Sequence, residues 1–224
     1  MSDLIQTYSD IHTIGKHCIQ NFGENIEPFT EVLSGFYHLK LDLLIKVNNT
    51  KLVHNIQCVQ DKIRSIEPNQ YYYPSNNLVI VFENILGFCC NTYYESQVML
   101  YDKALSECFK GLGKFTIRLK GLITSDSAII LKGYIHEGIL NVQSKIKKHF
   151  KKNNIFYCEG LKSGGCPLQI VKYIQPLKNR ERLIRLIDHA NNLYVGTETV
   201  YEIILVAHDA FSHNKIVLKT YKLL

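Results

Sequence analysis

One order of secondary-structure elements occurs twice along this chain, and it limits the fold more than any other feature. The continuous apolar run at residues 78–82 predicts a buried strand. A helical pattern follows at residues 93–112, and two strand patterns follow at residues 115–120 and 127–135. The first unit is therefore expected to have the order β-α-β-β.

The second unit begins with a strand pattern at residues 168–174. A helical pattern follows at residues 179–190, and strand patterns follow at residues 199–207 and 215–223. Two β-α-β-β units predict an α+β protein of two lobes, related by pseudo-twofold symmetry around a central cleft. A basic helix at about residues 139–152 is expected to connect the two units.

The residues before the first unit are expected to complete the same body. Apolar residues alternate from 36 to 47, which predicts a half-buried strand, and a helix is expected at residues 50–66. Residues 1–35 are expected to form an N-terminal helical segment, in which Pro28 opens a second short helix. No linker is recognisable after this segment, so residues 36–224 are expected to form a single bilobal domain.

Composition and charge exclude several classes of protein. The 224 residues suffice for one large domain, and the net charge of +6 favours an anionic partner, although lysines scattered over a surface give the same value. No apolar run approaches the roughly 18–20 residues that span a bilayer, so no membrane contact is expected. The 7 cysteines are irregularly spaced, and no signal peptide is recognisable. We therefore expect a cytoplasmic protein with free thiols, no metal and no cofactor.

Several segments of the sequence resemble one protein family. Residues 71–82 (YYYPSNNLVIVF) resemble the segment that carries the first His-x-Thr motif of bacterial and phage LigT-like 2H phosphoesterases. Residues 115–122 (FTIRLKGL) are similar to the family's Phe-x-Ile-x-Leu-x-Gly strand. Three further segments are similar to the next strand, the second motif strand and the C-terminal turn, in this order: residues 128–134, 168–173 and 196–200. The resemblance implies a two-lobed 2H-phosphoesterase-like fold with one motif per lobe facing a shared cleft.

Both diagnostic motifs are missing from this sequence. In active members of the family, two histidines act as general base and general acid on a phosphodiester, and two threonines bind phosphate oxygens. The resemblance aligns the first motif with Val79 and Val81 and the second with Pro167 and Gln169. Valine and proline transfer no proton, although Gln169 can still form a hydrogen bond. Because each acid or base is worth roughly 10²–10⁴-fold in rate, the resemblance implies a protein without catalytic residues.

Polar and aromatic residues remain on the strands around the implied cleft. Six of them are candidates for contacting a ligand: Arg118, Lys120, Tyr134, His136, Gln169 and Tyr173. Arg118 and Lys120 lie on the polar face of their strand and are expected to contact phosphates. Tyr173 is expected to stack on a base.

The resemblance and the missing motifs lead to one functional hypothesis. The chain is expected to be a catalytically inactive protein that binds and sequesters a nucleotide, either a cyclic nucleotide or a 2′,5′-linked oligonucleotide second messenger, with short RNA as a further ligand class. The absence of tryptophan and the abundance of Asn, Ile, Lys and Tyr are typical of an AT-rich bacterial, phage or viral genome. In a phage or virus, such a sponge would act against a host defence in the host cytoplasm.

Two alternatives stay open at this point. The first is an active 2′,5′- or cyclic-nucleotide phosphodiesterase with relocated acid and base, drawn from His38, His136, His208 and His213. The second is a non-enzymatic protein-interaction module whose cleft has filled with apolar side chains. The residues expected to fill the cleft in that case are Val79, Val81, Leu168 and Val171.

Overall fold

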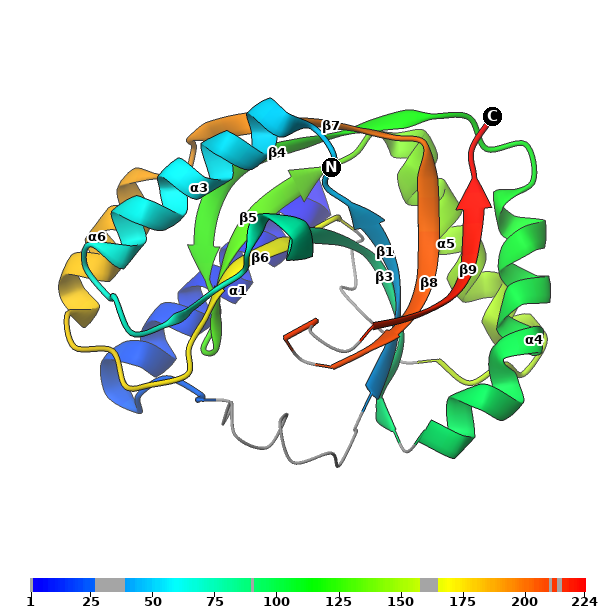
Figure 1. Ribbon diagram of the computed structural model, residues 1–224, viewed down its shortest axis with the longest axis horizontal. Helices are drawn as coiled ribbons and strands as arrows, with labels where there is room; N and C mark the ends of the chain where they lie inside the picture. Colours follow the sequence, from blue (N-terminus) through cyan, green and yellow to red (C-terminus); the bar gives the residue numbers. More distant parts are fainter. Residues whose placement is uncertain (1, 27–38, 90, 158–164, 210, 213–214) are drawn as a thin grey trace.

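Two antiparallel sheets form the centre of the protein (Figure 1). The computed structural model describes residues 2–26, 39–89, 91–157, 165–209, 211–212 and 215–224. The four-stranded sheet has the order β3 (Val79–Cys89), β1 (Leu39–Lys46), β8 (Glu202–His208) and β9 (Lys215–Lys222). The five-stranded sheet has the order β2 (Tyr71–Tyr72), β6 (Leu168–Lys172), β5 (Ala128–Tyr134), β4 (Phe115–Thr124) and β7 (Tyr194–Val200).

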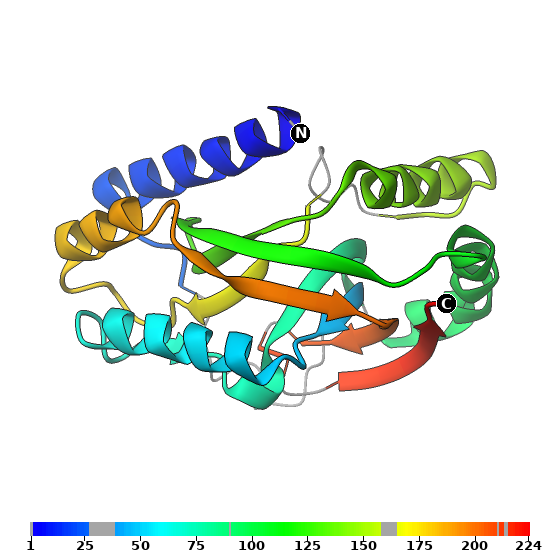
Figure 2. The ribbon, with the colours of Figure 1, turned by 90° about the horizontal axis from the view of Figure 1, so that it is seen from above.

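Helices lie around the outside of both sheets, so that each sheet has its own cover. Their bounds are α1 (Ser2–Asn21), α3 (Thr50–Arg64), α4 (Asn91–Phe109), α5 (Glu137–Lys152) and α6 (Arg180–His189), with a 3₁₀ turn at Ser75–Asn77. In Figure 1 and Figure 2, α3 and α6 lie beside the five-stranded sheet, whereas α4 and α5 pack together beside the four-stranded sheet. The expected two-lobed α+β fold is confirmed.

The two sheets meet where β3 passes the start of β6. The backbone N–H of Val81 donates to the carbonyl oxygen of Pro167 over 3.0 Å. From α5, the side-chain amide nitrogen of Gln143 donates to the carbonyl oxygens of Phe82 at 2.6 Å and Gly165 at 3.0 Å. These bonds connect backbone groups of both lobes. They place β3 and β6, the two strands that the family resemblance aligns with the motifs, side by side at the centre of the molecule.

The repeated units do not correspond to the two lobes. The first unit divides because β3 belongs to the four-stranded sheet while β4 and β5 belong to the other, and the second divides between β7 and β8. The single strand predicted at residues 199–207 is therefore wrong. The chain leaves one sheet after Val200 and enters the other at Glu202. Apolar residues continue across this boundary, with Glu202 as the only charged residue between Val200 and Ala207, so the sequence pattern does not mark it.

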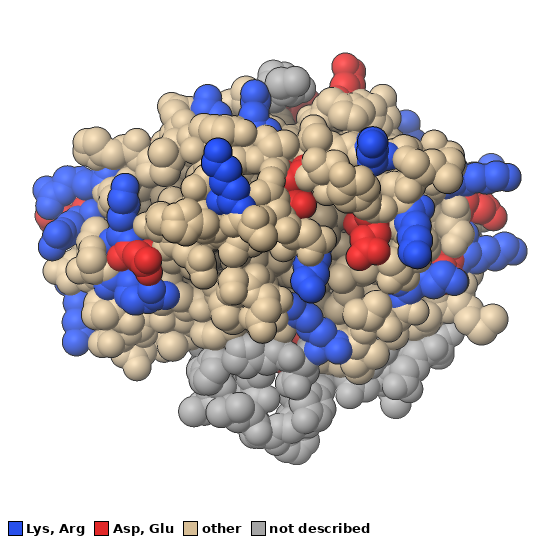
Figure 3. All heavy atoms as spheres, turned by 45° about the horizontal axis from the view of Figure 1, so that its top comes forward, with Lys and Arg blue, Asp and Glu red and all other residues tan. Residues whose placement is uncertain are grey.

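Charged side chains are distributed over the surface. On the face shown in Figure 3, Lys and Arg lie at both ends of the molecule and over its middle, with Asp and Glu between them. On this face the net charge of +6 does not form one continuous basic stripe. Among the described residues, no helix is long and apolar enough to cross a membrane.

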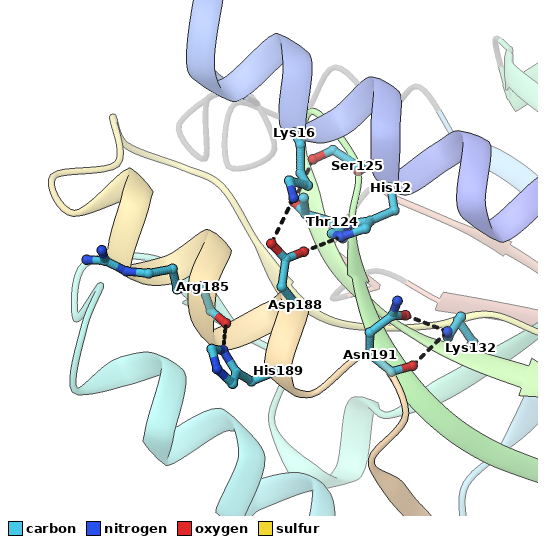
Figure 4. A network of polar contacts seen from close by, with 9 residues as sticks. All are labelled: His12, Lys16, Thr124, Ser125, Lys132, Arg185, Asp188, His189 and Asn191. Carbon is cyan, nitrogen blue, oxygen red and sulfur yellow. Dashed lines mark hydrogen bonds and ion pairs between the residues drawn. The ribbon is translucent and has the colours of Figure 1, made fainter.

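Helix α1 is joined to the five-stranded lobe by a partly buried polar contact (Figure 4). His12 Nε2 lies 2.8 Å from one carboxylate oxygen of Asp188 on α6, and Lys16 Nζ lies 2.8 Å from the other. The backbone N–H of Thr124 donates to His12 Nδ1 over 3.3 Å. The N-terminal helix thus packs against the same core as the rest of the chain, while the second helix expected at Pro28 falls outside the described residues.

Gly15 sets the distance between α1 and β4. A Cβ atom at this position would overlap the carbonyl oxygen of Thr124 and would lie 2.7 Å from backbone atoms of Ser125. We therefore expect Gly15→Ala to push α1 away and to lower the free energy of unfolding by about 1–3 kcal/mol, measured by urea denaturation. Gly113→Ala is the matched control, because its Cβ would meet only one atom at an ordinary 3.7 Å. Equal decreases in the free energy of unfolding of the two variants would contradict this account of the packing.

Candidate functional site

A cleft of about 200 Å³ lies where the two sheets meet. Its walls come from α1, from the strands β1, β3, β4, β5, β6 and β8, and from the segments that flank them. The lining residues are Tyr8, Ile11, Lys40, Tyr73, Asn77, Val79, Val81, Asn84, Ile123, Ile130, Pro167, Gln169, His208 and Ser212. All four positions that the sequence aligns with the missing motifs are among them.

Strand alternation explains how the motif positions reach the cleft. Val79 and Val81 are half-buried and face the cleft, whereas Ile80 between them is fully buried in the core. On the facing segment, the side-chain oxygen of Gln169 accepts a hydrogen bond from the hydroxyl of Tyr73 over 3.2 Å. The motif positions thus give the cleft two valines, a proline and an amide, and none of these exchanges a proton near neutral pH.

A buried charged cluster forms the wall of the cleft on the four-stranded sheet. Asp42 is fully buried, and its Oδ2 lies 2.9 Å from His208 Nε2 and 3.3 Å from Lys40 Nζ. Its Oδ1 accepts from the side-chain amide of Asn84 over 2.9 Å. The strand register brings these groups together, because Lys40 pairs with His208 across β1 and β8, and Asp42 pairs with Asn84 across β1 and β3.

Burial and the charge of the partner shift the pKa values of Asp42 and His208 in opposite directions. Burial favours a raised pKa for Asp42, but Lys40 and the hydrogen bond to His208 outweigh it and hold the pKa of the carboxyl below its ordinary value. Burial lowers the pKa of His208, and the hydrogen bond to Asp42 opposes this shift only in part. A neutral His208 therefore donates from Nε2 to an ionised Asp42.

The second nitrogen of His208 faces the turn that follows β8. Nδ1 lies 3.1 Å from the hydroxyl oxygen of Ser212 and 2.9 Å from the carbonyl oxygen of Asp209. In neutral His208, Nδ1 has a free lone pair and accepts from Ser212. When protonated, it donates to Asp209. The cleft therefore contains an imidazole oriented by a carboxylate, which is the arrangement of many general bases.

The six predicted ligand-binding residues lie in different surroundings. Gln169 lines the cleft as described above. Arg118 lies outside the lining, with its guanidinium 5.9 Å from the centre of the Tyr134 ring, and that ring packs on the ring of Tyr8 at 5.7 Å. Arg118 and Tyr134 therefore lie beyond Tyr8, next to the cleft. His136 is exposed and accepts the backbone N–H of Gly138 at the start of α5.

The remaining two predicted residues have other surroundings. Lys120 is half-buried and close enough to Lys132 to lower the pKa of that ammonium, after the larger effect of burial. Tyr173 is fully buried, and its hydroxyl lies 2.7 Å from the side-chain oxygen of Thr124. The stacking predicted for Tyr173 is therefore wrong, because its strand turns this side chain into the core. His38 and His213 lie outside the described residues.

Sequence reasoning missed most of the polar wall. Asp42 stands between Leu41 and Leu43 in its strand, and that position was the available signal, since an ionised group among buried apolar residues needs a buried partner. The contribution of α1 through Tyr8 and Ile11 had no signal of its own. Within the described ranges, no three His, Cys, Asp or Glu side chains gather closely enough to hold a metal ion.

Comparison with known proteins identifies the fold. No protein-family model and no curated protein matches the chain. Its structure is similar to TT0787 of Thermus thermophilus, with a TM-score of 0.62, 13% identity and coverage of 82% of this chain and 97% of that chain. It is also similar to E. coli LigT complexed with 3′-AMP, with a TM-score of 0.53, 13% identity and coverage of 83% and 98%. This chain has a 2H phosphoesterase fold.

A third solved structure, described as a phosphoesterase, matches with a TM-score of 0.50, 13% identity and coverage of 84% of this chain and 99% of that chain. All three structures are covered almost over their full length, so the whole 2H phosphoesterase fold is present here and not only one lobe. At this level of identity the similarity concerns the fold. The chemistry of the cleft depends on this chain's own residues.

Glu83 gives the site a pH dependence of its own. It follows Val81 on β3, is buried, and has Lys147 Nζ 3.4 Å from its Oε1. Burial raises the pKa of Glu83 from 4.5 to about 7, with Lys147 opposing the shift and Asp42 adding to it. The folded protein therefore binds this proton more tightly than the unfolded chain, and the resulting stability is complete below pH 4.5 and is lost as the pH rises to about 7.

We expect Glu83→Gln to remove this pH dependence. Between about pH 4.5 and 8, the wild-type free energy of unfolding should fall by up to about 3 kcal/mol more than that of the variant. Urea denaturation at a series of pH values measures the difference. Parallel stability curves for the two proteins would contradict the raised pKa.

Proposed function

We propose that this protein binds a nucleotide in the cleft and holds it without hydrolysis. One observation carries the proposal: a cleft lies where the two sheets meet, and the positions that the family resemblance aligns with the two motifs, Val79, Val81, Pro167 and Gln169, line it. A protein that has kept the cavity but lost both histidines retains binding without proton transfer at those positions. The E. coli LigT structure with 3′-AMP supports a nucleotide as the class of ligand.

The lining suits a nucleotide in size and in chemistry. Valine, isoleucine and proline side chains provide apolar surface for a base or a ribose, and Asn77 and Gln169 provide amides for its polar edges. Lys40, which is partly exposed and paired with Asp42, provides a cation for a phosphate. The cavity of about 200 Å³ is smaller than the roughly 300–1,000 Å³ typical of drug-sized ligands, which favours one nucleotide unit inside it.

The finer form of the proposal is a sponge for a signalling nucleotide. A cyclic nucleotide, or one unit of a 2′,5′-linked oligonucleotide with the remainder at the rim, fits the cavity size. In a phage or virus, sequestration of such a messenger in the host cytoplasm would weaken a host defence. A short RNA would bind in the same way, through its terminal nucleotide.

Capture and release of nucleotides tests this proposal. Purified protein is mixed with cyclic mono-, di- and trinucleotides and 2′,5′-oligoadenylates, filtered, and then heated to denature it. We expect at least one nucleotide to be depleted from the filtrate and to be recovered intact after heating, as measured by chromatography. Depletion of none would refute nucleotide binding, and recovery as cleaved products would refute an inactive protein.

Substitutions in the cleft connect the capture to the site. We expect Lys40→Ala and Gln169→Ala each to weaken binding of the captured nucleotide by about tenfold, because each removes a hydrogen bond, charge-assisted in the case of Lys40. Lys222→Ala and Gln57→Ala are the matched controls, since both side chains are exposed and lie outside the cleft lining. Equal weakening by the control variants would place the binding site elsewhere.

A second candidate function has one observation in its favour. His208 lines the cleft, is oriented by Asp42 and contacts Ser212, so it would serve as the relocated base of an active phosphodiesterase. In that case the wild type and the control His189→Asn would release cleaved nucleotide, and His208→Asn, with its folding checked by circular dichroism, would release none. Intact nucleotide from all three proteins would exclude this candidate.

The protein-interaction alternative requires apolar residues to close the cleft. Leu168 and Val171 are fully buried in the core, whereas Val79 and Val81 line an open cavity. This separation gives the alternative no support, because the four side chains do not act together to fill the space.

A further inference from the structure

A buried amide oxygen beside the cleft has no partner. Gln143 on α5 is only 2% exposed, and its Oε1 is the buried side-chain atom without a hydrogen bond among the described residues. Its amide nitrogen donates to the carbonyl oxygens of Phe82 and Gly165. Reversing the amide would point Oε1 at those two acceptors. The orientation is therefore fixed, and Oε1 requires a donor from elsewhere.

A small pocket is lined in part by Gln143. It is lined by Val81, Phe82, Glu83, Asn84, Gln143, Gly165 and Pro167 and has a volume of about 20 Å³. Val81, Asn84 and Pro167 also line the nucleotide cleft, so the pocket adjoins that cleft. The volume accommodates one water molecule or a group of similar size, such as an amino group.

The polar groups of the pocket select a hydrogen-bond donor. Gln143 presents an acceptor of fixed orientation, and the Glu83 carboxylate is a second acceptor when it is ionised. The amide nitrogen of Asn84 donates one of its two hydrogens to Asp42. Lys147, Asp42 and Cys166 are the other titratable groups that interact with Glu83, and Lys147 contacts its Oε1.

We propose that this pocket is a subsite for the exocyclic amino group of a nucleobase bound in the cleft. The inference rests on the proposed nucleotide function and adds the identity of the base. One amino hydrogen donates to Gln143 Oε1 and the other to the Glu83 carboxylate, while the apolar side chain of Val81 borders the pocket. Adenine, guanine and cytosine carry such an amino group, whereas hypoxanthine and uracil do not. The site therefore prefers an amino base.

Two ligand pairs test the subsite on the unmodified full chain. Adenosine 3′-monophosphate is compared with purine riboside 3′-monophosphate, and guanosine 3′-monophosphate with inosine 3′-monophosphate, by isothermal titration calorimetry at pH 8. The members of each pair differ by one amino group. We expect the compound without the amino group to bind at least about tenfold more weakly in one of the pairs, because Gln143 Oε1 then stays unpaired.

A variant links the preference to the pocket. Glu83→Gln keeps the shape of the side chain but replaces the carboxylate by an amide. In one orientation the amide N–H₂ group faces the amino group of the ligand, and in the other the amide oxygen faces it without a negative charge. We expect the affinity ratio within the discriminating pair to fall at least about threefold. The control Glu202→Gln, at an exposed position on β8, should leave the ratio unchanged.

The outcomes separate the two proposals. Binding of these nucleotides with equal affinity within both pairs would overturn the amino subsite and leave a water molecule as its occupant, while nucleotide binding itself would stand. A preference that survives Glu83→Gln unchanged would also overturn the subsite as assigned. If neither the four monophosphates nor the nucleotides of the capture experiment bind, the proposed function fails, and this inference fails with it.

Discussion

The hydrogen bond from Val81 to Pro167 is the contact on which the rest of the structure depends. It joins two sheets that otherwise have separate edges, and the amide of Gln143 reinforces it by binding the carbonyls of Phe82 and Gly165. Because the bond between Val81 and Pro167 is made by backbone on both sides, it does not depend on which side chains occupy the motif positions. The fold can therefore keep its cleft while the residues inside the cleft change.

The cleft has apolar groups on one side and a polar cluster on the other. At the motif positions, apolar side chains and one amide stand where the family resemblance implies imidazole and hydroxyl groups. On the neighbouring strands, Asp42, Lys40 and His208 form a compact cluster in which each charge has a partner. Such a cluster is costly to bury without complete pairing. Its position at the cleft wall makes it the polar counterpart of the apolar motif strands.

The sequence predicted the elements well where one face of an element is apolar throughout. The strand around Val81 followed from a continuous apolar run, the basic helix α5 from its periodicity, and the two-lobed architecture from the repeated order of elements. Prediction was wrong where tertiary structure decides the outcome: at Tyr201, where the chain changes sheets, and at Tyr173, whose aromatic ring suits either a core or a ligand surface. Lys40 and His208 come together only through the pairing of β1 with β8, which no local pattern reveals.

The placement of β8 has a consequence for how the protein is made. Asp42 meets His208 across 166 residues of sequence, and β8 lies between β1 and β9 in the four-stranded sheet. Contacts between such distant residues form late, because a large loop must close before they contribute any stability. While the ribosome is still synthesising the chain, Asp42 remains without its histidine. The cleft thus becomes complete only after β8 has been made, and a chain that ends before β8 would leave the buried Asp42 carboxylate without its histidine instead of forming a smaller working protein.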